Sequence, residues 1–281
     1  MVDYKNSKWI KQIAELQRPD GSFGHFHSMS RTTSTKDIST EQALRRLYVL
    51  GLRKDDEPIR LALDYMKGVL SGDFIPPDGR EKVLNWDAFE KHMFAAWIRI
   101  FDANEPLALS VANMWKDIIT TTFSSGSFSE EEYLKEHRKR IPILHSGERL
   151  IDISQFYMVN ILKGLLDEET ENAFFEHILN NPKGIYYVYQ NKMRDLPPVF
   201  ASRRTSLYLA ALEQLLGYRC SSEKLSFAKE WLLSNRDSDG EWDLGTKAND
   251  GVYFPLSDSW RTVEIRKKDC TFKINNLLEK M

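Results

Sequence analysis

Five Gly-x-aromatic triplets recur along the chain at nearly even intervals. They begin at Gly21, Gly72, Gly126, Gly184 and Gly240, so successive glycines are 51, 54, 58 and 56 residues apart. Each triplet follows a segment with helical periodicity and precedes another such segment. A period of this length is typical of repeat architectures, in which one supersecondary unit occurs several times. The repeat therefore constrains the fold more than any single motif does.

Helix signals fill the segments between the triplets. Ser39 and Gln42 have the spacing of a capping box, Pro58 suits the first turn of a helix, and Asn85 is placed to cap another helix. Only the tetrapeptide 186–189 has strand-like composition, and it is too short to build a sheet. The sequence therefore predicts an all-α fold. The ten main helices are expected at about 5–16, 39–51, from Pro58 onward, 86–102, 106–123, 149–166, 168–180, 203–217, 222–234 and 258–280.

The main helices differ in character by turns. Those that precede a triplet, such as 168–180, have one apolar face, whereas those that follow a triplet, such as 150–166, are apolar on most faces. A helix that is apolar on most faces is buried on most faces. We therefore expect an α/α toroid of about five helical hairpins, with an inner and an outer ring, as a single domain over 1–281. A short charged helix at about 129–139 lies in an insertion near 126–148, and the two ends of the chain are expected to pair.

Composition argues against several classes of function. The formal net charge is -2, which removes the electrostatic basis for binding nucleic acid. The sequence contains no run of about 18 apolar residues, so no transmembrane segment is expected. The N-terminal residues have no apolar signal core, and Cys220 and Cys270 form no C-x-x-C pair. These features favour a reducing, cytoplasmic location.

Two of the triplets belong to a longer element. The segment Gln17–Gly24 (QRPDGSFG) resembles the Q-x-x-x-G-x-[W/F] element of squalene and hopene cyclases and of protein prenyltransferase β subunits, and Asn235–Trp242 (NRDSDGEW) is a weaker copy. In those families the element joins an outer helix to the next inner helix of an α/α toroid, so the resemblance implies the same frame here. We interpret all five triplets as structural connectors. The glycine permits positive φ, the ring packs on the neighbouring hairpin, and the Gln or Asn amide satisfies carbonyl groups.

The catalytic motifs of those families are incomplete in this chain. The segment 237–240 (DSDG) lacks the last carboxylate of the D-x-D-D acid motif, and 55–59 (DDEPI) lacks the last carboxylate of the magnesium-binding D-D-x-x-D motif. Protein prenyltransferases bind zinc through a D-x-C pair and a later His, whereas here Asp269 and Cys270 are adjacent and no His follows His177. We therefore expect neither a metal nor a cofactor.

Candidate functional residues follow from the expected frame. The inner helices of a toroid run in the same direction, so their N-termini gather at one mouth of the central cavity and make it partly positive. Acidic side chains there are explained by the helix dipole, whereas an arginine needs a carboxylate, such as Asp152 or Asp87, or an anionic ligand. We take Asp152 and Asp87 as candidate catalytic residues. The candidate ligand-binding residues near the same mouth are Arg203, Arg204, Arg261, Gln155, Glu90, Tyr208, Trp97 and Trp260.

Three functions remain open at this point. The first is a prenyltransferase-like or terpene-cyclase-like toroid that binds a small, partly apolar, anionic ligand, such as an isoprenoid diphosphate, in the central cavity. The second is a carbohydrate-active hydrolase or lyase, which would use a carboxylate pair and aromatic platforms. The third is a non-catalytic scaffold whose centre is filled by side chains. An open apolar cavity would favour the first, a polar groove with two carboxylates the second, and a filled centre the third.

Overall fold

The protein is built from helices, which confirms the predicted all-α class. The computed structural model describes residues 4–27 and 38–281, and within these ranges it contains twelve α-helices, one short 3-10 helix and three isolated β-bridges, with no strand. Within the same ranges, no helix has both the length and the apolar character needed to cross a membrane.

The helices alternate in position along the chain. Those that precede a triplet are α1 (Lys8–Ala14), α3 (Glu57–Ser71), α5 (Pro106–Thr122), α8 (Glu168–Asn180) and α11 (Ser226–Ser234). Those that follow one are α2 (Thr40–Val49), α4 (Trp86–Phe101), α7 (Phe156–Ile161), α9 (Arg203–Leu215) and α12 (Val263–Leu278). The others are α6 (Glu130–Arg140) in the predicted insertion, α10 (Ser221–Lys224) and the 3-10 helix η1 (Thr246–Ala248).

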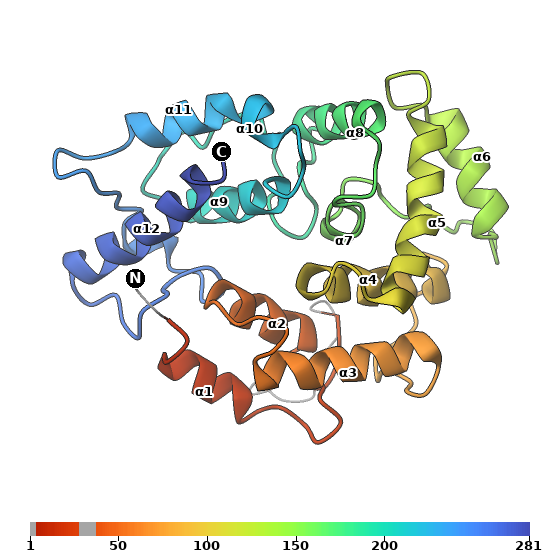
Figure 1. Ribbon diagram of the computed structural model, residues 1–281, viewed down its shortest axis with the longest axis horizontal. Helices are drawn as coiled ribbons and strands as arrows, with labels where there is room; N and C mark the ends of the chain where they lie inside the picture. Colours follow the sequence, from red (N-terminus) through yellow and green to blue (C-terminus); the bar gives the residue numbers. More distant parts are fainter. Residues whose placement is uncertain (1–3, 28–37) are drawn as a thin grey trace.

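Figure 1 shows the chain running once around the molecule, from α1 and α3 along the lower edge, through α5 and α6 on the right, to α11 and α12 on the left. In this view α2, α4, α7 and α9 lie nearer the centre than α1, α3, α5 and α8. Among the helices that follow a triplet, α4 contacts α7, α7 contacts α9, and α9 contacts α12. The expected pairing of the two ends is also present, since Tyr4 OH donates to Asp269 Oδ1 at 2.8 Å and Trp9 Nε1 donates to Ser257 O at 2.9 Å.

Local sequence explains where several helices begin. Ser39 and Gln42 form the predicted capping box at the start of α2, and Asn85 Oδ1 accepts the Ala88 N–H at 3.2 Å at the start of α4. Pro58 lies in the first turn of α3. Each residue satisfies or removes an N–H group that a helix start would leave unpaired, so these boundaries follow from short-range chemistry.

The expected helix at 149–166 is shortened to α7, and residues 149–155 are not helical. The Asp152 carboxylate accepts the Ser154 N–H at 2.8 Å and the Ser154 hydroxyl at 2.7 Å. A side chain that bonds the backbone two residues ahead competes with helix formation. Asp152 therefore precedes α7 instead of lying on one face of it with Gln155, as the sequence pattern predicted.

Two other helices also differ from the prediction. The last one begins at Val263 rather than near 258, because the Thr262 hydroxyl accepts the Ile265 N–H at 3.4 Å and caps it there. The helix expected at 222–234 is divided into α10 and α11 at Leu225. Trp260 and Arg261 consequently lie before α12 and do not open it.

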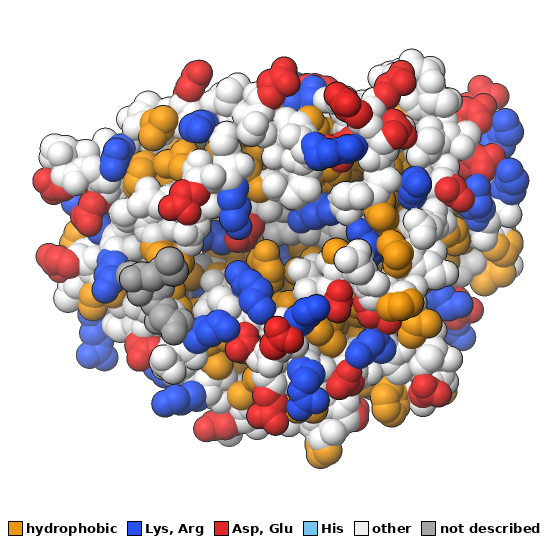
Figure 2. Space-filling view, viewed as in Figure 1, with side chains coloured by type: hydrophobic (Ala, Val, Ile, Leu, Met, Phe, Trp, Pro, Cys, Tyr) orange, Lys and Arg blue, Asp and Glu red, His pale blue; other side chains and the backbone are white. Residues whose placement is uncertain are grey.

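The space among the central helices is filled around their aromatic side chains. Trp97 and Phe94 of α4, Tyr157 of α7 and Tyr208 of α9 are each at most 1% exposed. A side chain without accessible surface has no water-sized space beside it, so an open cavity does not reach these four residues. At the surface, Figure 2 shows basic and acidic side chains interspersed over the visible face, in keeping with the net charge of -2.

The first triplet has the structural role that was predicted for it. Gly21 has φ 89°, and a Cβ at this position would lie 2.2 Å from the Leu61 carbonyl oxygen of α3. Gln17 Nε2 donates to Gly21 O at 2.9 Å and to Pro58 O at 2.8 Å, and Phe23 is 2% exposed. The turn is therefore held against the next hairpin by its glycine, its amide and its ring.

Candidate functional site

The connections between helices fall into two groups by length. Those that lead into a helix that follows a triplet are long, whereas those that leave such a helix are short. Long connections are where binding and catalytic residues concentrate. The long connections span 15–39, 72–85, 141–155, 181–202 and 235–262, and the short ones span 50–56, 102–105, 162–167 and 216–220.

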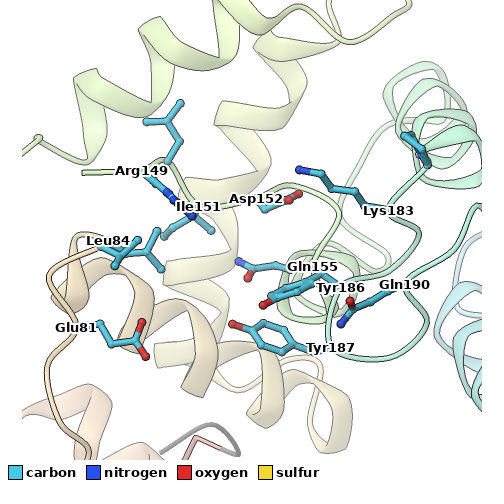
Figure 3. Close-up of a pocket in the computed structure, with 13 residues that line it drawn as sticks. Glu81, Leu84, Arg149, Ile151, Asp152, Gln155, Lys183, Tyr186, Tyr187 and Gln190 are labelled. Carbon is cyan, nitrogen blue, oxygen red and sulfur yellow. The ribbon is translucent and has the colours of Figure 1, made fainter. Parts of the chain in front are cut away.

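A pocket of about 650 Å³ opens between three of the long connections. Its lining comes from residues 81–84, 149–155 and 182–190 (Figure 3). This volume is within the range of small-molecule sites. The pocket is therefore the principal candidate for a functional site.

One wall of the pocket is held in place by α6. Tyr133 OH donates to the Ile151 carbonyl oxygen, and the Ile151 N–H donates to His137 Nε2 at 3.5 Å. Burial lowers the pKa of His137 to about 4, so the ring is neutral near pH 7 and keeps a nitrogen able to accept this bond. On the other side, the Arg149 N–H donates to Val83 O at 2.8 Å. The insertion thus positions the segment that carries Arg149 and Asp152.

The floor of the pocket is formed by two adjacent tyrosines. The Phe156 N–H donates to Tyr186 O at 3.0 Å and the Tyr186 N–H donates to Ser154 O at 3.2 Å, so Tyr186 is held beside the start of α7. Tyr187 has φ 75° and is the only non-glycine residue with positive φ among those described. The Tyr186 and Tyr187 ring centroids are 4.2 Å apart. A bulky residue in this conformation is strained, and such strain concentrates at functional sites.

Gln155 lies between the wall and the floor. It is 3% exposed, and its Nε2 has no hydrogen-bond partner among the described residues. Gln155 is the N-cap residue of α7, but its side chain does not cap the helix. In Figure 3 its amide and the phenol groups of Tyr186 and Tyr187 point into the same space, opposite Glu81 and Leu84. A buried unpartnered amide is rare and needs an explanation.

The pocket contains charges of both signs. Arg149 and Lys183 line it, and no described carboxylate lies within ion-pair distance of either. Asp152 and Glu81 also line the pocket. Asp152 already accepts the two bonds from Ser154. The site therefore offers two cations that are free to meet an anion, and two carboxylates that can accept hydrogen bonds.

A buried polar cluster lies beneath the floor. Glu41 is 0% exposed, and its Oε1 accepts hydrogen bonds from Tyr157 OH at 2.8 Å, Arg45 Nη2 at 3.1 Å and Trp97 Nε1 at 3.3 Å. Burial, followed by the charge of Glu41, raises the pKa of Tyr157 well above its usual value, so the phenol stays protonated and donates. Arg45 Nη1 also donates to Tyr187 O at 3.4 Å. The cluster joins α2, α4 and α7 and supports the strained residue of the floor.

No protein-family model, curated protein or solved structure matches the chain. The site is therefore interpreted from its own residues. Among the residues that the structure describes, no three His, Cys, Asp or Glu side chains are grouped so that they could hold a metal ion.

Of the two candidate catalytic carboxylates, the structure places only Asp152 in this pocket. Asp87 is exposed in the first turn of α4 and forms an ion pair with Arg80. Glu90, in the same helix, accepts a hydrogen bond from Trp86 Nε1 at 3.1 Å, and burial raises the pKa of its carboxyl group. Both acidic groups at the start of α4 therefore have protein partners away from the pocket.

The two arginines expected at the start of α9 are found there, but without the expected partners. Arg203 is exposed, and Arg204 Nε donates to Tyr189 OH at 3.2 Å. Neither guanidinium group is ion-paired with Asp152 or Asp87. Tyr208, one turn below Arg204, is buried, and its OH donates to Met193 O at 3.0 Å.

The remaining predicted residues lie elsewhere. Trp97 is buried against Glu41. Trp260 Nε1 donates to Asp269 Oδ2 at 2.7 Å, and Trp260 lines a separate pocket of about 240 Å³ next to Trp9. Arg261 is exposed beside it. The predicted ligand-binding residues are therefore dispersed, and Gln155 alone among them lines the larger pocket.

Sequence reasoning missed the residues that define the floor. Tyr187 was noted only as part of a strand-like tetrapeptide, and no local sequence pattern predicts its positive φ. Glu41 and Arg45 are spaced i, i+4 on a helix whose other side is apolar, which is the one signal that could have indicated a buried ion pair. Arg149 and Lys183 lie in connections between helices. Basic residues are common there, so the sequence alone does not distinguish these two as binding residues.

Proposed function

We propose that the protein is an α/α toroid whose long connections form a binding pocket for a small, partly apolar, anionic ligand. The alternation of central and peripheral helices, their successive contacts and the contact between the two chain ends support the toroid. This frame is the one implied by the resemblance to terpenoid cyclases and prenyltransferase β subunits. Both cysteines are free thiols, which is in keeping with a cytoplasmic setting.

One observation carries the assignment of the site. The strained Tyr187 and the unpartnered Nε2 of Gln155 occur in the same pocket. A non-glycine residue at positive φ costs about 1–3 kcal/mol, and a buried unpaired amide costs about 1–3 kcal/mol. Folds keep such costs chiefly where a ligand or a reaction repays them, so two of them in one pocket favour a binding site.

The charge and shape of the ligand follow from the lining. Arg149 and Lys183 have no carboxylate partner among the described residues, so they are available to a carboxylate or phosphate group. Leu84, Tyr186 and Ile151 provide apolar surface beside them. The ligand is therefore expected to combine an anionic group with an apolar face. If the site is catalytic, Asp152 is the carboxylate placed to act.

The carbohydrate-active alternative is retained because of a specific feature of the lining. The pocket combines two carboxylates, Asp152 and Glu81, with an aromatic surface at Tyr186, the pairing that sugar-processing sites use. A long isoprenoid chain, in contrast, would need open space next to Trp97 and Tyr157. Both side chains are buried, so there is no such space beside them. The geometry therefore favours ligands no larger than the pocket itself.

The proposal is tested by a binding panel with charge-matched variants. Inorganic pyrophosphate, farnesyl diphosphate and galacturonate are each titrated into the full chain by calorimetry and thermal shift. We expect at least one anionic probe to bind, and the double variant Arg149→Ala/Lys183→Ala to bind it at least about 10-fold more weakly, as the loss of a charge-assisted contact predicts. Neither side chain has an ion-pair partner among the residues that the structure describes, so the variant should fold normally.

The matched control is Arg138→Ala/Lys139→Ala, which removes the same charge from the exposed face of α6. It should retain wild-type affinity. Absence of binding by every anionic probe, or equal loss of affinity in both double variants, would refute the assignment of this pocket.

A further inference from the structure

The polar groups that line the pocket outnumber those needed by an apolar ligand with one charged end. Gln155 contributes an amide with an unused Nε2, Tyr186 and Tyr187 direct phenol groups into the same space, and Gln190 adds a second amide. Among the described residues, the two phenol groups have no hydrogen-bond partner. A hydrocarbon chain would leave all of them unpaired, whereas a ligand with several hydroxyl groups would pair them.

The balance of charges in the pocket favours a ligand with one carboxylate over a ligand with a diphosphate. The pocket has two cations, Arg149 and Lys183, and two carboxylates, Asp152 and Glu81. The two positive and two negative side chains cancel, so the pocket has no net positive charge to attract a ligand with two or more negative charges. The two carboxylates would also repel such a ligand. A ligand with one carboxylate can meet a cation, while its hydroxyl groups donate to Asp152 or Glu81. The mixed charges therefore favour a monoanion rich in hydroxyl groups.

The shape of the site favours a ring. Tyr186 is 39% exposed and lines the pocket, so its ring is available for stacking. The backbone bonds that join Tyr186 to residues 154 and 156 hold this ring beside the Gln155 amide. A flat or puckered ring on Tyr186 would bring its substituents next to Gln155.

Resting on the proposed function, we propose that the ligand is a uronic acid unit, a six-membered ring with hydroxyl groups and one carboxylate, and that Gln155 is a specificity-determining residue for it. The Gln155 amide hydrogen-bonds a hydroxyl group of the ring, a group that a diphosphate ester of a hydrocarbon lacks. Arg149 or Lys183 pairs with the carboxylate. The unit is either a free sugar acid or the end of an acidic oligosaccharide, and both present the same groups.

Calorimetry with galacturonate, tetragalacturonate, galactose and farnesyl diphosphate tests this inference. We expect both uronates to bind the wild-type chain, and galactose to bind at least about 10-fold more weakly because it lacks the carboxylate. A higher affinity for tetragalacturonate than for galacturonate would identify an oligosaccharide end as the natural form, and equal affinities would identify the free acid.

The residue-level test compares Gln155→Leu with Gln190→Leu. The first should weaken uronate binding about 10-fold without lowering the melting temperature, since its Nε2 has no partner to lose within residues 4–27 and 38–281. A merely structural Gln155 would instead lower the melting temperature. The second, at an exposed amide of the same pocket, should change affinity less than about 3-fold.

The outcomes separate this inference from the proposal on which it rests. Binding of farnesyl diphosphate that depends on Arg149 and Lys183, together with failure of both uronates, overturns the uronate assignment and leaves the anion site standing. Equal binding of galactose and galacturonate also overturns it. Failure of every anionic probe removes both.

Discussion

In the first Gly-x-aromatic triplet the ring of Phe23 is 2% exposed, whereas in the fourth triplet the ring of Tyr186 is 39% exposed and lines the pocket. The two triplets occupy the same place in the repeat, between a peripheral helix and the next central one. Both glycines have positive φ, 89° at Gly21 and 60° at Gly184. The turn is therefore common to both, but the use of the ring is not.

The surroundings of each triplet explain the difference. Gln17 connects the first turn to Pro58 of the next hairpin, which brings the ring of Phe23 against the core. At the fourth triplet the chain folds back on itself, and the Ile185 N–H donates to Tyr189 O at 2.9 Å. This tight reversal turns Tyr186 outward over the start of α7. The same three residues thus form a connector in one hairpin and part of a pocket in another.

The ring of Phe74 in the second triplet is also exposed, at 44%, but it does not line the pocket. The interpretation of all five triplets as connectors is therefore incomplete for the fourth. Its backbone still makes the turn, as expected. Its ring is partly exposed and contacts the ring of Tyr187. The lesson is that the motif determines a backbone turn, and the flanking residues determine where its aromatic ring is placed.

The largest effect should come from removing the ring of Phe23, and removing the ring of Tyr186 should have a much smaller one. Phe23→Ala is expected to lower the free energy of unfolding by about 3–5 kcal/mol, because it leaves a cavity in the core. Tyr186→Ala should cost no more than about 1 kcal/mol, because its ring is partly exposed. Urea unfolding followed by circular dichroism measures both. Similar losses in the two variants would remove the distinction between connector and pocket.

The next effect concerns the glycines of the first and second triplets. Gly21→Ala should cost about 3 kcal/mol or more, since it combines positive φ with a clash against Leu61 O. Gly72→Ala is the matched control, because its φ is also 89° but a Cβ there has no neighbour within 4 Å. It should cost only about 1–2 kcal/mol. If the control is equally destabilised, close packing on α3 is not what distinguishes the first turn.

The smallest effect should come from the amides. Gln17→Ala removes hydrogen bonds to Gly21 and Pro58 and is expected to cost about 1–2 kcal/mol. Asn235→Ala, in the weaker copy of the element, removes a bond to Trp231 O of its own helix at 2.8 Å and should cost less than about 1 kcal/mol. The same unfolding measurement applies. A larger loss for Asn235→Ala would contradict the view that the Gln17 bond between hairpins is the important one.

Much of the fold was predictable because its signals are local. The caps at Ser39 and Asn85 and the proline at the start of α3 act within one helical turn, and each was found where the sequence placed it. The prediction failed at 149–166, where a run of apolar residues suggested a helix. There the Asp152 side chain bonds the backbone and the segment contacts the 81–84 connection instead.

The site was less predictable than the frame. Gln155 and Asp152 were chosen because they share a face near the start of an expected inner helix, and both line the pocket. Arg203, Arg204, Arg261 and Asp87 were chosen from their place at expected helix starts, and none of them lines it. A position on a helix indicates the direction of the dipole, but it does not indicate which connections fold over that end.

The sequence by itself determined the helical class, the repeat of helix, triplet and helix, and most helix starts, because periodicity, caps and turn glycines act over a few residues. Only the tertiary structure decided that the central aromatic residues fill their own space, that α6 holds one wall of the pocket, and that Tyr187 is strained beside an unpartnered Gln155. These features depend on contacts between segments as far apart as 41–45, 133–157 and 183–187. Such contacts are set by packing, and a pattern within one segment does not specify which distant segment it contacts.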